Sequence, residues 1–102
     1  CEETFAPIVS IVSYETLDEA IAHVNNSSLG LNAGIYTNIL TDAMRAADEL
    51  EAGAVIINDI PTFRVDNMPY GGVKMSGYGK EGIKYAVEEM TSLKFITIKT
   101  IF

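Results

Sequence analysis

The sequence predicts an α/β fold whose centre is a parallel β-α-β-α-β unit. Short β-branched runs alternate with segments in which apolar residues recur at helical spacing. The connections between these runs are long enough for helical crossovers, which make neighbouring strands parallel and their connections right-handed. The last run of the unit, Ala54 to Ile57, is apolar throughout, as a central parallel strand should be. With 102 residues, the chain is limited to one domain at most.

The first strand and helix are expected before Gly30. Ile8 to Tyr14 are mostly β-branched or aromatic, which favours a largely buried strand. Thr16 and Glu19 match a capping box, in which two side chains bond backbone N–H groups at the start of a helix. A polar cluster and Gly30 end this helix. Its buried stripe is expected to be formed by Leu17, Ile21 and Val24.

The second strand and helix are expected between the first helix and the third strand. Leu31 to Thr37 form a short strand of mostly small residues, and Asn38 or Thr41 caps the helix that follows. Gly53 stands where a helix end prefers a left-handed residue. The buried stripe of this helix is expected to be formed by Ala43, Ala47 and Leu50.

A glycine-dense run from Pro69 to Gly82 follows an irregular loop, Asn58 to Pro69. Five of the eight glycines in the chain lie in this run. Because glycine raises the entropic cost of folding, the cluster indicates positive φ angles or close approach of another surface. We expect a loop that is held against the rest of the fold.

A third helix and a terminal strand are predicted after the glycine run. The helix begins at Lys80 or Gly82. Its apolar face is formed by Ile83, Val87 and Met90. The tail from Leu93 to Thr100 has apolar residues on both faces, but the α/β unit offers it no obvious partner. We therefore expect it to add to another sheet, in the same protein or in a neighbour.

Charge and composition argue against several classes of partner. Seven basic and fourteen acidic residues give a net charge of −7, which disfavours nucleic acid and anionic membranes. No apolar run approaches the roughly 18–20 residues that span a bilayer. The single cysteine excludes a disulfide framework and fits a reducing compartment, so the cytoplasm is expected. The 48% hydrophobic content predicts surface that another chain, or the rest of a larger protein, covers.

Several side chains are suited to chemistry, and each also has a simpler structural explanation. Cys1 could be a nucleophile, but a terminal thiol lacks oxyanion donors and a fixed position. Glu2 and Glu3 are either solvated charges or acceptors for ribose hydroxyls. His23 lies off the apolar stripe of the first helix, and without a second histidine no metal site is predicted.

The long loop and the glycine run carry two further candidates. Arg64, next to Phe63, is suited to bidentate binding of carboxylate or phosphate, and an ion pair with Asp59 or Asp66 is an equal alternative. Lys74 either binds an anion or keeps the loop soluble.

Gly77 to Gly82 fit the G-x-G-x-x-G pattern of dinucleotide-binding loops. The residues before the pattern are not strand-like, and no acid follows at the required spacing, so a structural turn is favoured. The sequence pairs no general base with a nucleophile, and we assign no catalytic residue.

Four motifs in order give the chain a resemblance to the aldehyde dehydrogenase superfamily. They are E-E-T-F-A-P at residues 2–7, N-S-S-L-G-L at residues 26–31, L-E-A-G-A-V-I-I-N at residues 50–58 and P-Y-G-G-V-K-M-S-G at residues 69–77. The resemblance implies that residues 1–90 are the C-terminal part of a longer catalytic domain. It implies that residues 91–102 carry an oligomerisation strand.

The same resemblance implies roles for single residues. Glu3 matches the glutamate that binds the nicotinamide ribose of NAD or NADP, and Phe5 matches the aromatic residue near the nicotinamide ring. Ala6 replaces the usual glycine of that motif. The nucleophilic cysteine, the general base and the dinucleotide-binding domain are implied upstream, so Cys1 is not the nucleophile.

The loop from Asp59 to Tyr70 corresponds to the substrate-tunnel loop of the family, so Phe63, Arg64 and Tyr70 are expected to face the aldehyde. The chain looks most similar to the branch that oxidises lactaldehyde or, without phosphorylation, glyceraldehyde 3-phosphate. Residues 93–100 resemble the strand that extends the sheet of a neighbouring subunit, which implies a homo-oligomer.

The expected function is therefore part of an NAD(P)-dependent oxidation of a small aldehyde to the acid, with the isolated chain inactive. Two alternatives come from other classes. One is a stand-alone module that dimerises by exchanging its last strand and does no chemistry. The other is an independent nucleotide-binding domain that uses Gly77 to Gly82.

Overall fold

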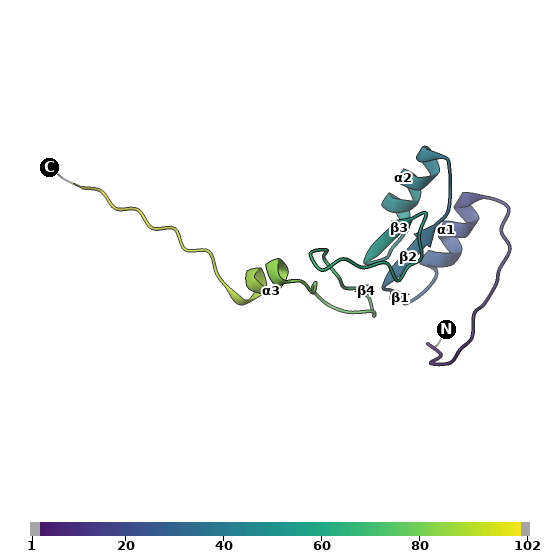
Figure 1. The fold of residues 1–102 in the computed structure, drawn as a ribbon, viewed down its shortest axis with the longest axis horizontal. Coiled ribbons are helices and arrows are strands. Elements are labelled where there is room, and N and C mark those ends of the chain that lie inside the picture. The colour runs from purple at the N-terminus through teal and green to yellow at the C-terminus, as the bar shows by residue number, and fades with distance from the viewer. Residues whose placement is uncertain (1–2, 101–102) are drawn as a thin grey trace.

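The computed structural model describes residues 3–100, which form a folded centre with an extended segment at each end (Figure 1). The elements in chain order are α1 (Leu17–Asn25), β1 (Leu29–Gly30), β2 (Asn32–Ile35), α2 (Leu40–Glu49), β3 (Ala54–Ile57), β4 (Val73–Lys74) and α3 (Ile83–Met90).

The centre is a β-α-β unit made of β2, α2 and β3. The two strands pair in parallel, from Asn32 opposite Ala54 to Ile35 opposite Ile57, and α2 crosses between them and packs on β3. This confirms the α/β class and the second half of the predicted unit. A separate antiparallel pair joins β1 to β4, with Gly30 opposite Val73. The sequence pattern did not predict β4, because it is two residues long and lies among glycines.

The expected first strand, Ile8 to Tyr14, does not form a sheet within residues 3–100. The segment is extended and exposed, and Ile11 is 93% accessible to solvent. Strand-forming side chains stabilise a strand only when a neighbouring backbone supplies hydrogen bonds. In the described part of the chain, β2 and β3 bond only to each other, so this segment has no partner.

Helix α1 begins as the capping box predicted. The backbone N–H of Glu19 donates to Thr16 Oγ1 at 3.2 Å, and the N–H of Glu15 donates to Glu19 Oε2 at 2.8 Å. The second bond reaches one residue before the cap, and it lowers the pKa of Glu19 below its ordinary value. Ile21 is buried and Leu17 half-buried, but Val24 is 49% exposed, so the predicted stripe is only partly covered.

Helix α2 differs from the prediction at its cap and on its buried face. Its N-cap is Ile39, and neither Asn38 nor Thr41 makes a capping bond. The buried side chains are Ala43 and Ala46, whereas Ala47 is exposed. The buried face of α2 therefore follows Ala43 by a three-residue step to Ala46, where the predicted stripe had a four-residue step to Ala47, and the predicted Leu50 is half-buried.

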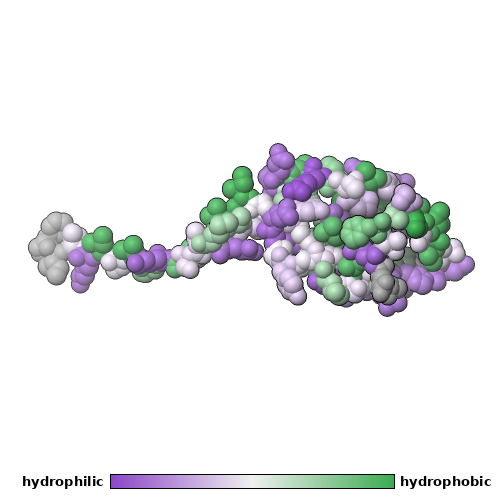
Figure 2. Space-filling model, turned by 90° about the horizontal axis from the view of Figure 1, so that it is seen from below, coloured by the Kyte–Doolittle hydropathy of each residue, from purple (hydrophilic) through white to green (hydrophobic). Residues whose placement is uncertain are grey.

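Helix α3 and the tail extend away from the centre. No residue of α3 is buried, and the tail from residue 91 to 100 is extended without a strand partner in the described chain. Figure 2 shows apolar side chains along this projection. The exposed apolar residues of the helix and tail are Ile83, Val87, Met90, Leu93, Phe95, Ile96 and Ile98.

The packed core of residues 3–100 is small, and its buried apolar side chains are Ile21, Ala43 and Ala46. The radius of gyration is 19.3 Å, and the principal extents are 75 × 34 × 23 Å. A compact chain of this length has a radius of gyration of about 13 Å. The fold therefore exposes apolar surface that a self-contained domain of this size would bury.

Candidate functional site

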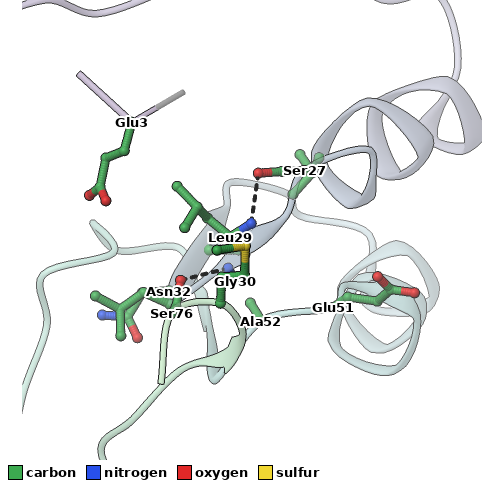
Figure 3. Close-up of a pocket in the computed structure, with 12 residues that line it drawn as sticks. Glu3, Ser27, Leu29, Gly30, Asn32, Glu51, Ala52 and Ser76 are labelled. Carbon is green, nitrogen blue, oxygen red and sulfur yellow. Dashed lines mark hydrogen bonds between the residues drawn. The ribbon is translucent and has the colours of Figure 1, made fainter. Parts of the chain in front are cut away.

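A pocket of about 460 Å³ lies between the N-terminal segment and the start of the β1 region (Figure 3). Glu3 lines it from the extended N-terminal segment, across a gap from the other labelled residues (Figure 3). Its other described lining residues are Val24, Ser27, Leu29, Gly30, Leu31, Asn32, Ala33, Glu51, Ala52, Met75 and Ser76. The pocket that the predicted cofactor contact Glu3 lines therefore also contains hydroxyl and amide side chains.

Two hydrogen bonds hold the glycine run against the β1 region at this pocket, Gly30 to Ser76 and Met75 to Ser28, and a third, Leu29 to Ser27, fixes the local turn before β1. The N–H of Gly30 donates to Ser76 Oγ at 2.8 Å, and the N–H of Leu29 donates to Ser27 Oγ at 3.1 Å (Figure 3). The N–H of Met75 donates to the carbonyl of Ser28 at 3.0 Å. These bonds confirm the prediction that the run is held against the fold.

Of the two roles that the sequence left open for Lys74, the structure shows anion binding, and the anion is the carboxylate of Glu51. Its ammonium donates to the carbonyl of Asn25 at 2.8 Å and to the carbonyl of Ser27 at 3.0 Å, and it pairs with Glu51 Oε2 at 2.5 Å. Asn25 is the last residue of α1, where a positive charge is favourable beside the helix dipole. The Lys74 side chain is 23% exposed. Lys74 therefore ties the glycine run to the ends of both central helices.

Gly53 is needed for close approach and not for a left-handed helix end. Its φ is not positive, and a β-carbon there would overlap the carbonyl oxygen of Gly71. Gly79 and Gly82, with φ of 72° and 122°, supply the positive angles expected of the run.

The Gly77 to Gly82 pattern does not have the geometry of a dinucleotide loop. That loop connects a parallel strand directly to a helix. Here the preceding strand, β4, is antiparallel to β1, and two residues separate it from Gly77. The pattern forms turns before α3, as the structural alternative predicted.

Arg64 and Tyr70, two of the predicted tunnel residues, lie together with Glu81. The guanidinium carbon of Arg64 is 4.3 Å from the centre of the Tyr70 ring, and its Nη2 is 3.5 Å from Glu81 Oε2. The backbones of Tyr70 and Glu81 exchange two hydrogen bonds across an isolated bridge. The ion-pair partner of Arg64 is thus Glu81, and neither Asp59 nor Asp66. The sequence did not reveal this partner, because Glu81 lies 17 residues after Arg64 and only the turns of the glycine run bring the two residues together.

Phe63 lines a hollow that Arg64 does not line. The hollow has a volume of about 430 Å³, lies along β3, and is mostly apolar. Its described lining residues are Ala54, Val55, Ile56, Ile57, Asp59, Phe63, Val65 and Met68. Phe63 therefore lines an apolar surface, whereas the next residue, Arg64, belongs to the charged cluster with Tyr70 and Glu81.

The remaining predicted residues lie outside these groupings. Phe5 is 92% exposed and does not line the Glu3 pocket. His23 is an exposed helix residue whose Nε2 lies 3.6 Å from Glu19 Oε1. Cys1 and Glu2 lie outside the described residues. In the described part of the chain, no helix has the length and apolar character needed to cross a membrane.

Comparison with known proteins resolves the family. The sequence model of the aldehyde dehydrogenase family matches residues 1–96. The chain belongs to this family. A lactaldehyde dehydrogenase from Methanococcus maripaludis is 54% identical over 97% of this chain. A 3-sulfolactaldehyde dehydrogenase from Priestia aryabhattai is 55% identical over 95% of it.

Solved aldehyde dehydrogenases have the same fold. A salicylaldehyde dehydrogenase from Pseudomonas putida, complexed with salicylaldehyde, superposes with a TM-score of 0.86 at 35% identity, over 99% of this chain and 21% of its own. A glyceraldehyde-3-phosphate dehydrogenase from Methanocaldococcus jannaschii, complexed with NADP, gives 0.72 at 49% identity, over 76% and 17%. The chain spans 21% of the lactaldehyde dehydrogenase and 20% of the sulfolactaldehyde dehydrogenase.

Proposed function

We propose that this chain is the C-terminal part of an NAD(P)-dependent aldehyde dehydrogenase that oxidises a small aldehyde to the carboxylic acid. The family match over residues 1–96 carries the proposal, together with the short share of each relative that the chain spans. The large exposed apolar surface supports it, because in an intact enzyme the upstream part of the chain would cover that surface. In that enzyme, residues 8–14 would pair in the catalytic sheet.

Glu3 would bind the nicotinamide ribose of NAD or NADP. A carboxylate accepts hydrogen bonds from a pair of hydroxyls, and the Glu3 pocket has room and polar lining for a sugar. Phe5, two residues along the same segment, would pack near the nicotinamide ring and lose its present exposure. When bound, the cofactor accepts hydride from the aldehyde carbon.

The second group of proposed contacts faces the aldehyde. Arg64 offers planar hydrogen-bond donors to an anionic or hydroxylated substrate, and Tyr70 restricts its guanidinium through a cation–π contact. Phe63 would line the apolar wall of the tunnel. The proposed substrates are lactaldehyde or glyceraldehyde 3-phosphate, and the names of the similar enzymes support this class. The catalytic cysteine and general base would lie upstream.

Fragment complementation tests the proposal. The purified chain should reduce no cofactor with an aldehyde substrate, since the nucleophile and dinucleotide-binding domain would be missing. Co-expression with the upstream part of the gene should restore cofactor reduction, measured by absorbance. Turnover by the isolated chain would contradict the proposal, and so would an upstream gene segment that encodes no aldehyde dehydrogenase sequence.

The alternative function is a stand-alone module that dimerises by exchanging its last strand. The exposed, extended tail at residues 93–100 is the observation that favours it. This alternative predicts that the chain is expressed by itself, as a stable dimer with a cooperative unfolding transition. An aggregating or unfolded isolated chain would contradict it.

A further inference from the structure

Lys74 forms the junction between three walls of the Glu3 pocket. The first wall is the end of α1 with Ser27, the second is the turn at Glu51, and the third is the glycine run at Ser76. The Lys74 ammonium bonds the carbonyls of Asn25 and Ser27 in the first wall and the carboxylate of Glu51 in the second. Lys74 itself directly precedes the residues of the third wall.

The geometry of this junction is specific to lysine. A lysine ammonium has three N–H donors, and Lys74 has three acceptors within 3.0 Å. An arginine presents its donors in a plane and carries them on a different stem, so it cannot reproduce a three-way contact. Lys74 also has a φ of 54°, in the left-handed region that favours glycine. Such a conformation persists where the surrounding contacts fix it.

The opposite side of the pocket has no comparable support. Glu3 belongs to a segment that pairs with no strand among residues 3–100. The position of a sugar between Glu3 and the facing walls therefore depends on how firmly those walls are held. Ser27 and Ser76 both take part in the hydrogen bonds beside the pocket (Figure 3). The carbonyl of Ser27 accepts from Lys74, and Ser76 lies two residues after Lys74 in the chain.

We propose that Lys74 is a positioning residue for cofactor binding, acting by holding the three walls that face Glu3. This inference rests on the proposed function, in which Glu3 binds the nicotinamide ribose. Lys74 itself would touch no cofactor atom. Its effect on the reaction comes through the distance between Glu3 and the opposite walls.

The test uses the full-length enzyme and a double-mutant cycle between Lys74→Met and Glu3→Gln. NAD(P)H affinity is measured by fluorescence titration, and the melting temperature is recorded for every variant. Lys74→Met should weaken cofactor binding on the order of tenfold in the wild-type background, and by less than about twofold beside Glu3→Gln, because coupled residues are not additive. The KM for the aldehyde should stay within about twofold of the wild-type value, since the Arg64 cluster is not part of the junction.

Lys84→Met is the matched control. Lys84 is 73% exposed, and its contacts in the described chain are Glu88 at 4.0 Å and the Tyr85 ring centre at 5.7 Å, neither of which lines the Glu3 pocket, so its loss should leave cofactor affinity unchanged. If Lys74→Met does not fold, Lys74→Arg in the same two backgrounds gives the comparison, since it keeps the charge but not the three-way contact.

The outcomes separate the two proposals. A lower melting temperature with unchanged cofactor affinity would show that Lys74 is merely structural, and equal losses in both backgrounds would show that it does not act through Glu3. Either result overturns the inference alone. If Glu3→Gln itself leaves cofactor affinity unchanged, the proposed ribose contact is wrong, and the Lys74 inference fails with it.

Discussion

At the scale of single residues, Arg64 shares its charge between a ring and a carboxylate. Tyr70 covers one face of the guanidinium, and Glu81 approaches its edge at 3.5 Å. Both Arg64 and Glu81 are more than half exposed, so this ion pair is weak and an incoming anion can replace the carboxylate. The cluster therefore combines a fixed arginine with an exchangeable partner.

Replacing Arg64 should separate charged from neutral substrates. In the full-length enzyme, Arg64→Gln should raise KM for an aldehyde with a phosphate or carboxylate by on the order of tenfold, since charge-assisted bonds are lost. KM for a neutral aldehyde of similar size should change little. Steady-state kinetics with both substrates measures this. An equal change in both values would show that Arg64 does not recognise the anion.

The pH dependence of the stability of α1 in acid should depend on Glu19. The N–H of Glu15 bonds the ionised carboxylate and lowers the pKa of Glu19 below its ordinary value of 4.5. A depressed folded-state pKa adds stability above the unfolded pKa, and this stability is lost as pH falls through the folded value. Glu19→Gln should therefore destabilise the helix near neutral pH and have little effect at low pH. Denaturant unfolding as a function of pH measures the difference, with Glu88→Gln on exposed α3 as a control.

At the scale of elements, the turn after α2 and the glycine run meet without side chains between them. Gly53 donates its N–H to the carbonyls of Gly30 and Leu31, and its α-carbon faces the Gly71 carbonyl. The contact joins the entry of β3 to the loop that carries Lys74. A side chain at this point would push the two backbones apart.

Gly53→Ala should consequently cost more stability than Gly34→Ala. Alanine at Gly53 would overlap backbone, whereas a β-carbon at Gly34 would lie 3.1 Å from the Asp59 carbonyl and 3.3 Å from Pro61. Overpacking of this kind costs about 1–3 kcal/mol. Chemical denaturation of the full-length protein gives both values. Equal costs for the two substitutions would contradict the close approach at Gly53.

Local signals predicted the elements whose cause is local. The Thr16 capping box, the apolar run of β3 and the helical spacing of α1 depend on neighbours within a few residues, and each appears in the structure. The partner of Arg64, the bonds of Lys74 and strand β4 depend on residues between 17 and 49 positions away. A single sequence, considered without an alignment, carries no signal for such contacts. The predicted strand at residues 8–14 has the right composition but no partner in the described chain.

At the scale of the whole molecule, the tail at residues 93–100 is the segment proposed to join a neighbouring subunit. Removing these residues from the full-length enzyme should lower its oligomeric state, because the added strand supplies both backbone bonds and apolar contact. Light scattering measures the mass. Deletion of the two residues 101 and 102 alone is the control. An unchanged mass after the larger deletion would exclude the tail from the interface.

The unpaired tail has a consequence for any copy of the chain that has not joined a larger assembly. Leu93, Phe95, Ile96 and Ile98 lie in a short run that combines high hydrophobicity with strong strand preference, and β2 and β3 each leave one backbone edge unpaired in the described chain. Such segments seed fibrils when they meet one another. Lys94 lies within the run and Lys99 directly follows it, and both act as gatekeepers, since two like charges must stack in every added layer. Orphaned chains would thus be kept from polymerising by a pair of lysines.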